Sequence, residues 1–169
     1  MDLGLNDKKV LITGGSKGIG LACARAFMAE GAKVAIVSRS QENLNQARTL
    51  LGNAYTATAD LINAAAAAAM VEKVEKEFGP IDVLVNSAGA AKRTNADDLT
   101  PEAWRAAMDA KYFTYIHVID PLVKRMAARG SGVIVNIIGS GGKIASPIHL
   151  PGGSANAALM LATAGLANA

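Results

Sequence analysis

The glycine-rich segment TGGSKGIG, residues 13–20, constrains the fold more than any other part of this 169-residue chain. It follows an apolar run, Val10 to Thr13, that is typical of a buried strand, and it precedes an amphipathic stretch, Ile19 to Glu30, that is typical of a helix ending at Gly31. Glycines let the backbone turn sharply and approach a bound group closely, and the start of a helix offers free N–H groups to an anion. The strand, turn and helix therefore predict a cradle for phosphate groups.

Patterns typical of strands and helices alternate along the rest of the chain. Further strands are predicted at Lys33 to Ser38, Ala54 to Ala59, Ile81 to Asn86 and Ser131 to Ile138, and helices at Gln41 to Leu51, Leu61 to Phe78, Pro101 toward Arg129 and Ser154 onward. This alternation predicts parallel βαβ units in a doubly wound α/β sheet, built as one domain over residues 1–169. The last helix, Ala155 to Ala169, stops without a glycine cap, a basic last turn or a polar tail, so we expect the domain to be incomplete at its carboxyl terminus.

Composition excludes several classes of partner. Hydrophobic residues make up 51% and charged residues 18% of the chain, as in a globular domain with a buried parallel sheet. Aromatic residues make up only 4%, and the basic residues behind the net charge of +3 are scattered, which disfavours nucleic-acid binding. No apolar run is long enough to span a bilayer, residues 1–9 do not resemble a signal peptide, and the single Cys23 fits a reducing compartment. We predict a cytoplasmic protein with no membrane partner and no metal site.

A phosphate cradle at this place in a doubly wound sheet predicts a bound dinucleotide. Sites that prefer NAD(H) carry an acidic residue at the end of the second strand, where it binds the ribose diol. Here that place holds Ser38-Arg39-Ser40, and the guanidinium of Arg39 can form a fork to a 2′-phosphate. Lys17 lies in the loop facing the same pocket, whereas a solvated Arg39 with no ligand is the alternative. The sequence favours NADP(H) over NAD(H).

Three motifs in the expected order resemble those of the short-chain dehydrogenase/reductase family in its cofactor-binding half. They are TGGSKGIG, Asp60-Leu61 and Asn86-Ser87-Ala88-Gly89, and the stretch GVIVNIIGS (residues 132–140) with the helix after it extends the resemblance over essentially the whole chain. The resemblance implies a Rossmann-type three-layer sandwich with strand order 3-2-1-4-5, without the final strands and helices of a typical member. It also implies a homodimer or homotetramer built through the last two helices.

Asp60 matches the family residue near the adenine ring, and Asn86 to Gly89 match the segment that supports the sheet and lines the nicotinamide side. The predicted cofactor-binding residues are Gly14, Ser16, Lys17, Gly18, Ile19, Gly20, Arg39, Asp60, Leu61, Asn86, Ser87, Ala88 and Gly89.

The catalytic half departs from the family pattern, which supplies a tyrosine as proton donor, a lysine four residues later, a serine and an upstream asparagine. Aligning GGSANAAL (residues 152–159) with the family motif puts Gly153 at the tyrosine and Ala157 at the lysine. Ser140 keeps the family spacing of the serine, and Lys111 occupies the place of the asparagine. The glycine pair is expected to leave space for water or a substrate group where the tyrosine ring would stand.

Three residues are candidates for the missing proton chemistry. Ser140 would hydrogen-bond a carbonyl, although a hydroxyl alone is a poor acid at neutral pH. Lys111 becomes a usable proton donor if burial lowers its pKa, and is otherwise a lysine extending to the surface. His149 is a candidate if its loop reaches over the pocket, and is otherwise structural or solvated.

These patterns predict an NADP(H)-dependent oxidoreductase that acts on a carbonyl or alcohol substrate through an atypical active site. The alternative is a non-catalytic NADP(H)-binding protein, a sensor or an assembly partner, because the tyrosine and lysine are lost. An isomerase or dehydratase on the same scaffold stays open, since a fold does not fix a function.

Overall fold

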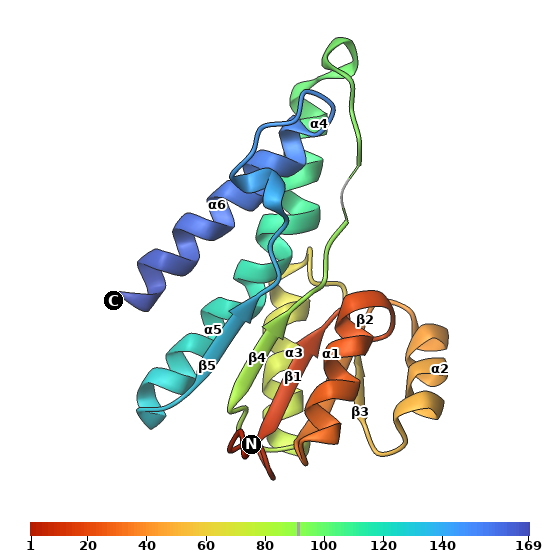
Figure 1. The fold of residues 1–169 in the computed structure, drawn as a ribbon, viewed down its shortest axis with the longest axis vertical. Helices are drawn as coiled ribbons and strands as arrows, with labels where there is room; N and C mark the ends of the chain where they lie inside the picture. Colours follow the sequence, from red (N-terminus) through yellow and green to blue (C-terminus); the bar gives the residue numbers. More distant parts are fainter. Residues whose placement is uncertain (91) are drawn as a thin grey trace.

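The computed structural model describes residues 1–90 and 92–169 and contains a five-stranded parallel sheet in the order β3-β2-β1-β4-β5 (Figure 1). This order and the α/β architecture confirm the prediction. The strands are β1 (Lys9–Thr13), β2 (Lys33–Ser38), β3 (Tyr55–Thr58), β4 (Val83–Asn86) and β5 (Val133–Asn136). The central strands are almost wholly apolar because helices bury them on both faces.

Helices form two layers around the sheet. One face packs against α1 (Gly18–Ala29) and α2 (Gln41–Leu51), and the other against α3 (Ala64–Glu77), α5 (Thr114–Arg129) and α6 (Leu150–Ala167). Beyond the carboxyl ends of the strands lie α4 (Pro101–Ala107) and the start of α6, at the upper end of Figure 1. Within the described ranges, no helix is both long enough and apolar enough to cross a membrane.

Three helix predictions differ from the structure in instructive ways. The helix expected from Leu61 begins at Ala64, because the Asn63 side chain caps it by accepting from the Ala66 N–H at 2.9 Å. The last helix begins at Leu150 rather than at Ser154, since Pro151 fits a first helical turn. The region from residue 101 to 129 is helical as predicted, but residues Met108–Phe113 form a π-helical segment, η2, between α4 and α5. Such segments are rare and occur frequently at functional sites.

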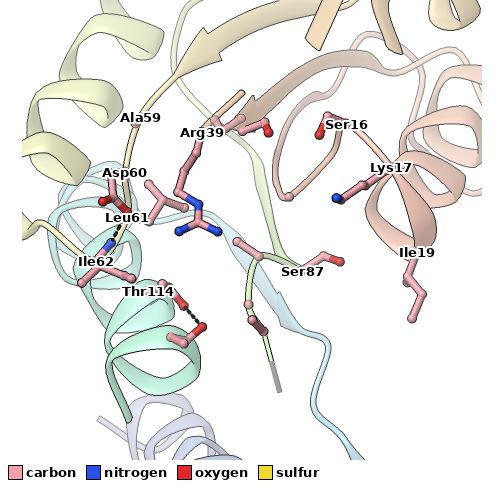
Figure 2. A pocket seen from close by; sticks show the side chains of 17 residues that line it. Ser16, Lys17, Ile19, Arg39, Ala59, Asp60, Leu61, Ile62, Ser87 and Thr114 are labelled. Carbon is pink, nitrogen blue, oxygen red and sulfur yellow. Dashed lines mark hydrogen bonds between the residues drawn. The ribbon is translucent and has the colours of Figure 1, made fainter. Parts of the chain in front are cut away.

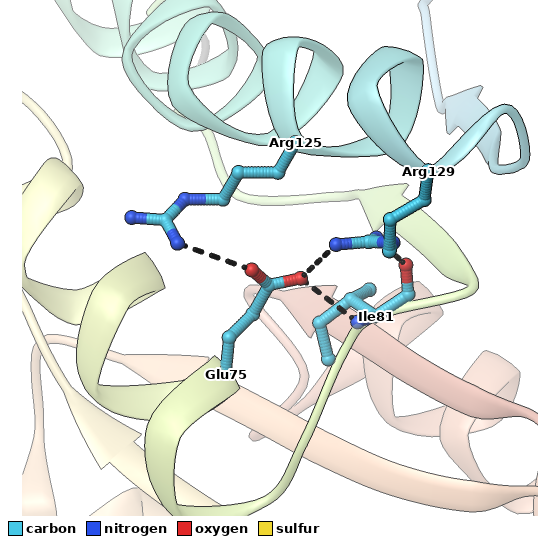
Figure 3. Close-up of polar contacts among 4 residues, drawn as sticks. All are labelled: Glu75, Ile81, Arg125 and Arg129. Carbon is cyan, nitrogen blue, oxygen red and sulfur yellow. Dashed lines mark hydrogen bonds and ion pairs between the residues drawn. The ribbon is translucent and has the colours of Figure 1, made fainter.

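A buried carboxylate fixes the entry to β4 (Figure 3). Glu75, on α3, accepts from the Ile81 N–H at 2.9 Å and from the guanidiniums of Arg129 at 3.0 Å and Arg125 at 3.4 Å. Arg129 also donates to the Ile81 carbonyl at 2.8 Å. Because the Glu75 side chain is only 9% exposed, these charge-assisted bonds tie α3, α5 and β4 together.

The edge strand β5 is covered on one face only. Val133 and Val135 are 55% and 44% exposed, whereas Val83 and Val85, which they pair with on β4, are buried beneath the α1/α2 layer. The layer formed by α1 and α2 therefore stops at β4.

Candidate functional site

A cavity of about 340 Å³ lies at the carboxyl edge of the sheet (Figure 2). Its walls come from the segments that follow β1, β2, β3 and β4, together with one face of η2 and α5. It brings together ten of the predicted cofactor-binding residues: Gly14, Ser16, Lys17, Ile19, Arg39, Asp60, Leu61, Ser87, Ala88 and Gly89. Among the described residues, no cluster of three or more His, Cys, Asp and Glu side chains is placed to hold a metal ion.

Glycines are required where the cradle loop touches the loop after β4. Gly14 has φ +66°, and a Cβ atom there would lie 2.8 Å from the backbone of Ala88. Gly20 packs against the backbone of Gly14, so a side chain at Gly20 would push the loop away from α1. The two close approaches explain why this turn has glycines at these positions.

The start of α1 is open to an anion. Ser40, Asn63 and Thr100 cap α2, α3 and α4 by accepting a backbone N–H, whereas in the described structure α1 has no side-chain cap and no acidic residue in its first turn. Ile19, in this first turn, lines the cavity together with Ser16 and Lys17. Free N–H groups, the helix dipole and a nearby ammonium are the donor set that a phosphate requires.

Two basic side chains reach the same cavity from opposite walls. In Figure 2, Arg39 extends from the end of β2 toward the wall that Asp60 and Leu61 form, and Lys17 points inward from the start of α1. Both are exposed, so both are available to a ligand. The end of β2 holds Arg39 at the place where sites that prefer NAD(H) carry an acidic residue.

The wall around Asp60 is held by contacts that sequence reasoning missed. The Asp60 carboxylate accepts from the Ile62 N–H at 3.2 Å, which turns the chain before α3. His117, on α5, donates from Nδ1 to the Leu61 carbonyl at 2.9 Å. The sequence holds no signal for this contact, because the partners are 56 residues apart.

Asn86 supports the site from beneath rather than lining it. Its side chain is fully buried, accepts from the Thr13 hydroxyl at 3.2 Å, and donates to Asn136 at 3.0 Å. Asn136 in turn donates to Thr163 on α6 at 2.9 Å. The chain of hydrogen bonds joins the carboxyl ends of β1, β4 and β5, so Asn86 positions the loop that follows it.

Lys111 lies in η2 directly beside the cavity. A Cβ atom on Gly89, which lines the cavity, would lie only 3.0 Å from Lys111 Cδ. Lys111 Nζ donates to the Tyr115 hydroxyl at 2.7 Å and to the Ile137 carbonyl at 3.0 Å. Burial lowers the pKa of Lys111 to about 8, and it raises the pKa of Tyr115 above its ordinary value. Lys111 is therefore a group that can exchange a proton near neutral pH.

Ser140 and His149 do not line this cavity. Ser140 is exposed at the start of a short 3-10 helix, η3 (Ser140–Gly142), three residues after the Ile137 carbonyl that holds Lys111. His149 lies with Lys143 in a second cavity of about 230 Å³ that shares no lining residue with the first.

The expectation of free space at the glycine pair holds only in part: Gly153 lines the second cavity, but the Cβ positions of both glycines are occupied. A Cβ atom on Gly152 would meet His149 Nε2 at 2.6 Å, and one on Gly153 would meet the Gly141 carbonyl oxygen at 2.8 Å. The imidazole and the loop after β5 occupy these two Cβ positions, because α6 begins before the pair and carries both glycines in its first turn. Ala157, which lines the second cavity, is exposed.

Comparisons with known proteins agree on one family. A family model described as short chain dehydrogenase matches residues 8–169. The chain is 36% identical over 170 residues to the uncharacterised oxidoreductase YvrD of Bacillus subtilis, covering 99% of this chain and 64% of that protein.

Solved structures show the same likeness. A short chain dehydrogenase from Bacillus anthracis superposes with a TM-score of 0.90 at 29% identity, covering 96% of this chain and 68% of the other. A variant of actinorhodin polyketide ketoreductase crystallised with NADPH also gives a TM-score of 0.90, at 30% identity over 95% of this chain and 64% of the ketoreductase. The chain thus spans less than two thirds of the length of YvrD and of the ketoreductase.

Proposed function

This chain belongs to the short-chain dehydrogenase/reductase family, and on that premise we propose that it is an NADP(H)-dependent oxidoreductase that interconverts a small carbonyl compound and its alcohol. One observation carries the proposal: the cavity that gathers the phosphate cradle, Arg39 and Asp60 is also lined by Gly89, against which a lysine of lowered pKa packs. When bound, a reduced nicotinamide supplies a hydride, so the chain itself must supply the proton.

The preference for NADP(H) rests on Arg39 and Lys17. A guanidinium and an ammonium on facing walls of the cavity suit the 2′-phosphate, and the ketoreductase that this chain resembles was solved with NADPH. We expect Arg39→Asp to weaken NADPH binding roughly ten- to a hundredfold, because a charge-assisted bond is replaced by repulsion. Fluorescence titrations with NADPH and NADH measure this, with Arg25→Asp on the exposed face of α1 as the control. An unchanged ratio of the two dissociation constants in Arg39→Asp would refute the assignment.

Lys111 is the proposed proton donor. Its pKa of about 8 keeps much of it protonated at neutral pH while leaving the proton easy to give up, as general acid catalysis requires. Carbonyl reduction needs the ammonium form, so its rate is expected to fall about tenfold per pH unit above pH 8. Ser140 and His149 remain candidates for a supporting role, with the exposed Ser140 hydroxyl nearer in the chain to the Lys111 contact at Ile137.

The test is turnover, followed at 340 nm with NADPH and a panel of carbonyl substrates. Lys111→Met is expected to lower the rate by at least a hundredfold without changing NADPH affinity, whereas Lys124→Met on the exposed side of α5 is expected to leave both unchanged. Equal rates in Lys111→Met and wild type would remove Lys111 from the mechanism. Tight NADPH binding with no turnover of any substrate would instead favour a non-catalytic NADP(H)-binding protein.

We further propose a cytoplasmic homodimer or homotetramer. Leu161 is 77% exposed on α6, and Ala157 and Ala164 lie exposed on neighbouring turns, so this helix presents an apolar face. Light scattering after size-exclusion chromatography measures the mass, and Leu161→Glu is expected to shift an oligomer toward the monomer. A monomeric wild-type protein would contradict the proposal.

A further inference from the structure

Three polar atoms form a closed triangle beside Gly89. The Lys111 Nζ atom lies 2.7 Å from the Tyr115 hydroxyl and 3.0 Å from the Ile137 carbonyl oxygen, and the hydroxyl lies 2.8 Å from the same carbonyl. The carbonyl can only accept, so the Tyr115 hydroxyl gives its single proton to Ile137. Toward Lys111 the hydroxyl is therefore an acceptor.

We propose that Tyr115 is a positioning residue: with the Ile137 carbonyl it binds two of the three N–H groups of Lys111 and directs the third toward the Gly89 end of the cavity. This inference rests on the proposed role of Lys111 as proton donor. Within residues 1–90 and 92–169, no third acceptor contacts the ammonium. The third N–H is thus the one that a ligand can take.

The same two contacts hold Lys111 before and after the reaction. During reduction, the third N–H bond breaks, its proton goes to the substrate oxygen, and its electron pair stays on Nζ as a lone pair while the substrate carbon receives the hydride. The neutral amine keeps two N–H groups, which still donate to Tyr115 and Ile137. Solvent then returns a proton to the lone pair. Neither step requires the side chain to move.

Few other ionisable or hydrogen-bonding groups lie near the Lys111 ammonium in the described part of the chain. Tyr115 is the one ionisable side chain that contacts Lys111 among the described contacts, and its ring centroid lies 4.4 Å from Nζ, where its face also attracts the ammonium. Gly89 after β4 and the Ile137 carbonyl after β5 also lie beside Lys111, and α6, which packs against η2, carries no ionisable side chain. The shift at Lys111 is caused by burial, with no contribution from a charged neighbour.

Tyr115→Phe is the direct test, since it removes one hydroxyl and keeps the ring. Lysine labelled with ¹³C at Cε reports the titration of Lys111 in the unliganded protein by NMR, with Lys111→Arg assigning the signal. An ammonium gains more from the hydroxyl than a neutral amine does, so Tyr115→Phe is expected to lower the titration midpoint by about 0.7 pH unit. Tyr55→Phe removes a hydroxyl bonded to Glu77 on the surface and is expected to change nothing at Lys111.

A second measurement on the wild-type protein does not depend on the variant folding. With ¹⁵N-labelled lysine below the midpoint, the hydrogen-bonded ammonium of Lys111 is expected to exchange slowly with water and give a cross-peak, unlike the exposed Lys33. An unprotected Lys111 ammonium, or equal midpoints in folded Tyr115→Phe and wild type, overturns the positioning role.

Activity separates the two proposals. If turnover depends on Lys111, its pH profile is expected to move down with the midpoint in Tyr115→Phe, and an unmoved profile refutes the inference alone. If the NMR shift appears but turnover is absent for every substrate, the contact geometry is correct and the proposed oxidoreductase function is wrong. The hydrogen bond between Tyr115 and Lys111 would then have no role in catalysis.

Discussion

Thr13→Val tests whether the end of β1 organises the wall of the cavity. The Thr13 hydroxyl is fully buried, accepts from the N–H groups of Ser87 at 3.1 Å and Ala88 at 3.2 Å, and donates to the Asn86 side chain at 3.2 Å. Valine has nearly the same shape, so the change removes these bonds without opening a cavity. The Ser87 N–H keeps the Thr13 backbone carbonyl as a partner at 3.2 Å. The Ala88 N–H and the side-chain amide oxygen of Asn86 lose their hydrogen-bond partner.

Leaving these two buried groups without a hydrogen-bond partner costs roughly 1–1.5 kcal/mol each. The free energy of unfolding is therefore expected to fall by about 2–3 kcal/mol. Urea denaturation followed by circular dichroism at 222 nm measures this, with an unchanged slope showing that the folded state is the same. Thr49→Val removes an exposed hydroxyl from α2 and is expected to cost less than about 0.5 kcal/mol. A Thr13→Val protein as stable as Thr49→Val would refute the reasoning, because the network would then contribute nothing.

Three further substitutions have defined outcomes in the same denaturation assay. Gly14→Ala combines φ +66° with the close Ala88 backbone and is expected to cost about 3 kcal/mol, whereas Gly52→Ala, at φ +76° with open space around it, is expected to cost about 1 kcal/mol; equal losses would contradict the packing argument. Glu75→Ala leaves the Arg129 guanidinium and the Ile81 N–H without their carboxylate partner, so it is expected to lower the free energy of unfolding by about 3 kcal/mol. Glu72→Ala, at an exposed position of α3, is expected to change it little. Burial lowers the pKa of Lys111 to about 8, so the buried ammonium destabilises the folded state below pH 8. This destabilisation disappears as the pH rises from about 8 toward 10.5, the pKa of a lysine in the unfolded chain. Lys111→Met is expected to be more stable than wild type by about 1 kcal/mol at pH 7, after allowance for partial exposure, and by less at pH 10; a constant difference would count against the lowered pKa.

The sheet and most of the cavity were predictable because each depends on short-range patterns. Apolar runs between amphipathic stretches gave all five strands, and the motifs at residues 13–20, 60–61 and 86–89 each follow a strand. The carboxyl ends of parallel strands share one edge, so residues far apart in sequence had to meet there. The register then explains Asn86, which pairs with Thr13 on one side and Asn136 on the other. A polar residue at the same level of three adjacent strands becomes a buried network rather than a ligand contact.

The surroundings of Lys111 were not predictable, because they depend on backbone geometry that carries no pattern in the sequence. The sequence predicts one continuous α-helix from residue 101 to 129. In the structure, η2 departs from the α-helical repeat and so changes which side chains face the strands. Tyr115 is fully buried four residues after Lys111, and both bind a carbonyl at the end of β5. Likewise, the volume at Gly152 is filled by His149 because α6 starts at Leu150, a boundary that Pro151 permits but does not fix.

The two ends of the cavity are therefore held by different parts of the fold. The cradle depends on close packing between the loops after β1 and β4, through Gly14 and Ala88, and on the open start of α1. Lys111 depends on η2 and on a backbone carbonyl after β5. Because, among the described residues, these supports share only the segment from Ser87 to Gly89, changes at Lys111 or Tyr115 are expected to leave the phosphate cradle intact. The proposed dinucleotide binding and the proposed proton transfer are then expected to be separable by mutation, which is the condition for deciding between an enzyme and a protein that only binds the cofactor.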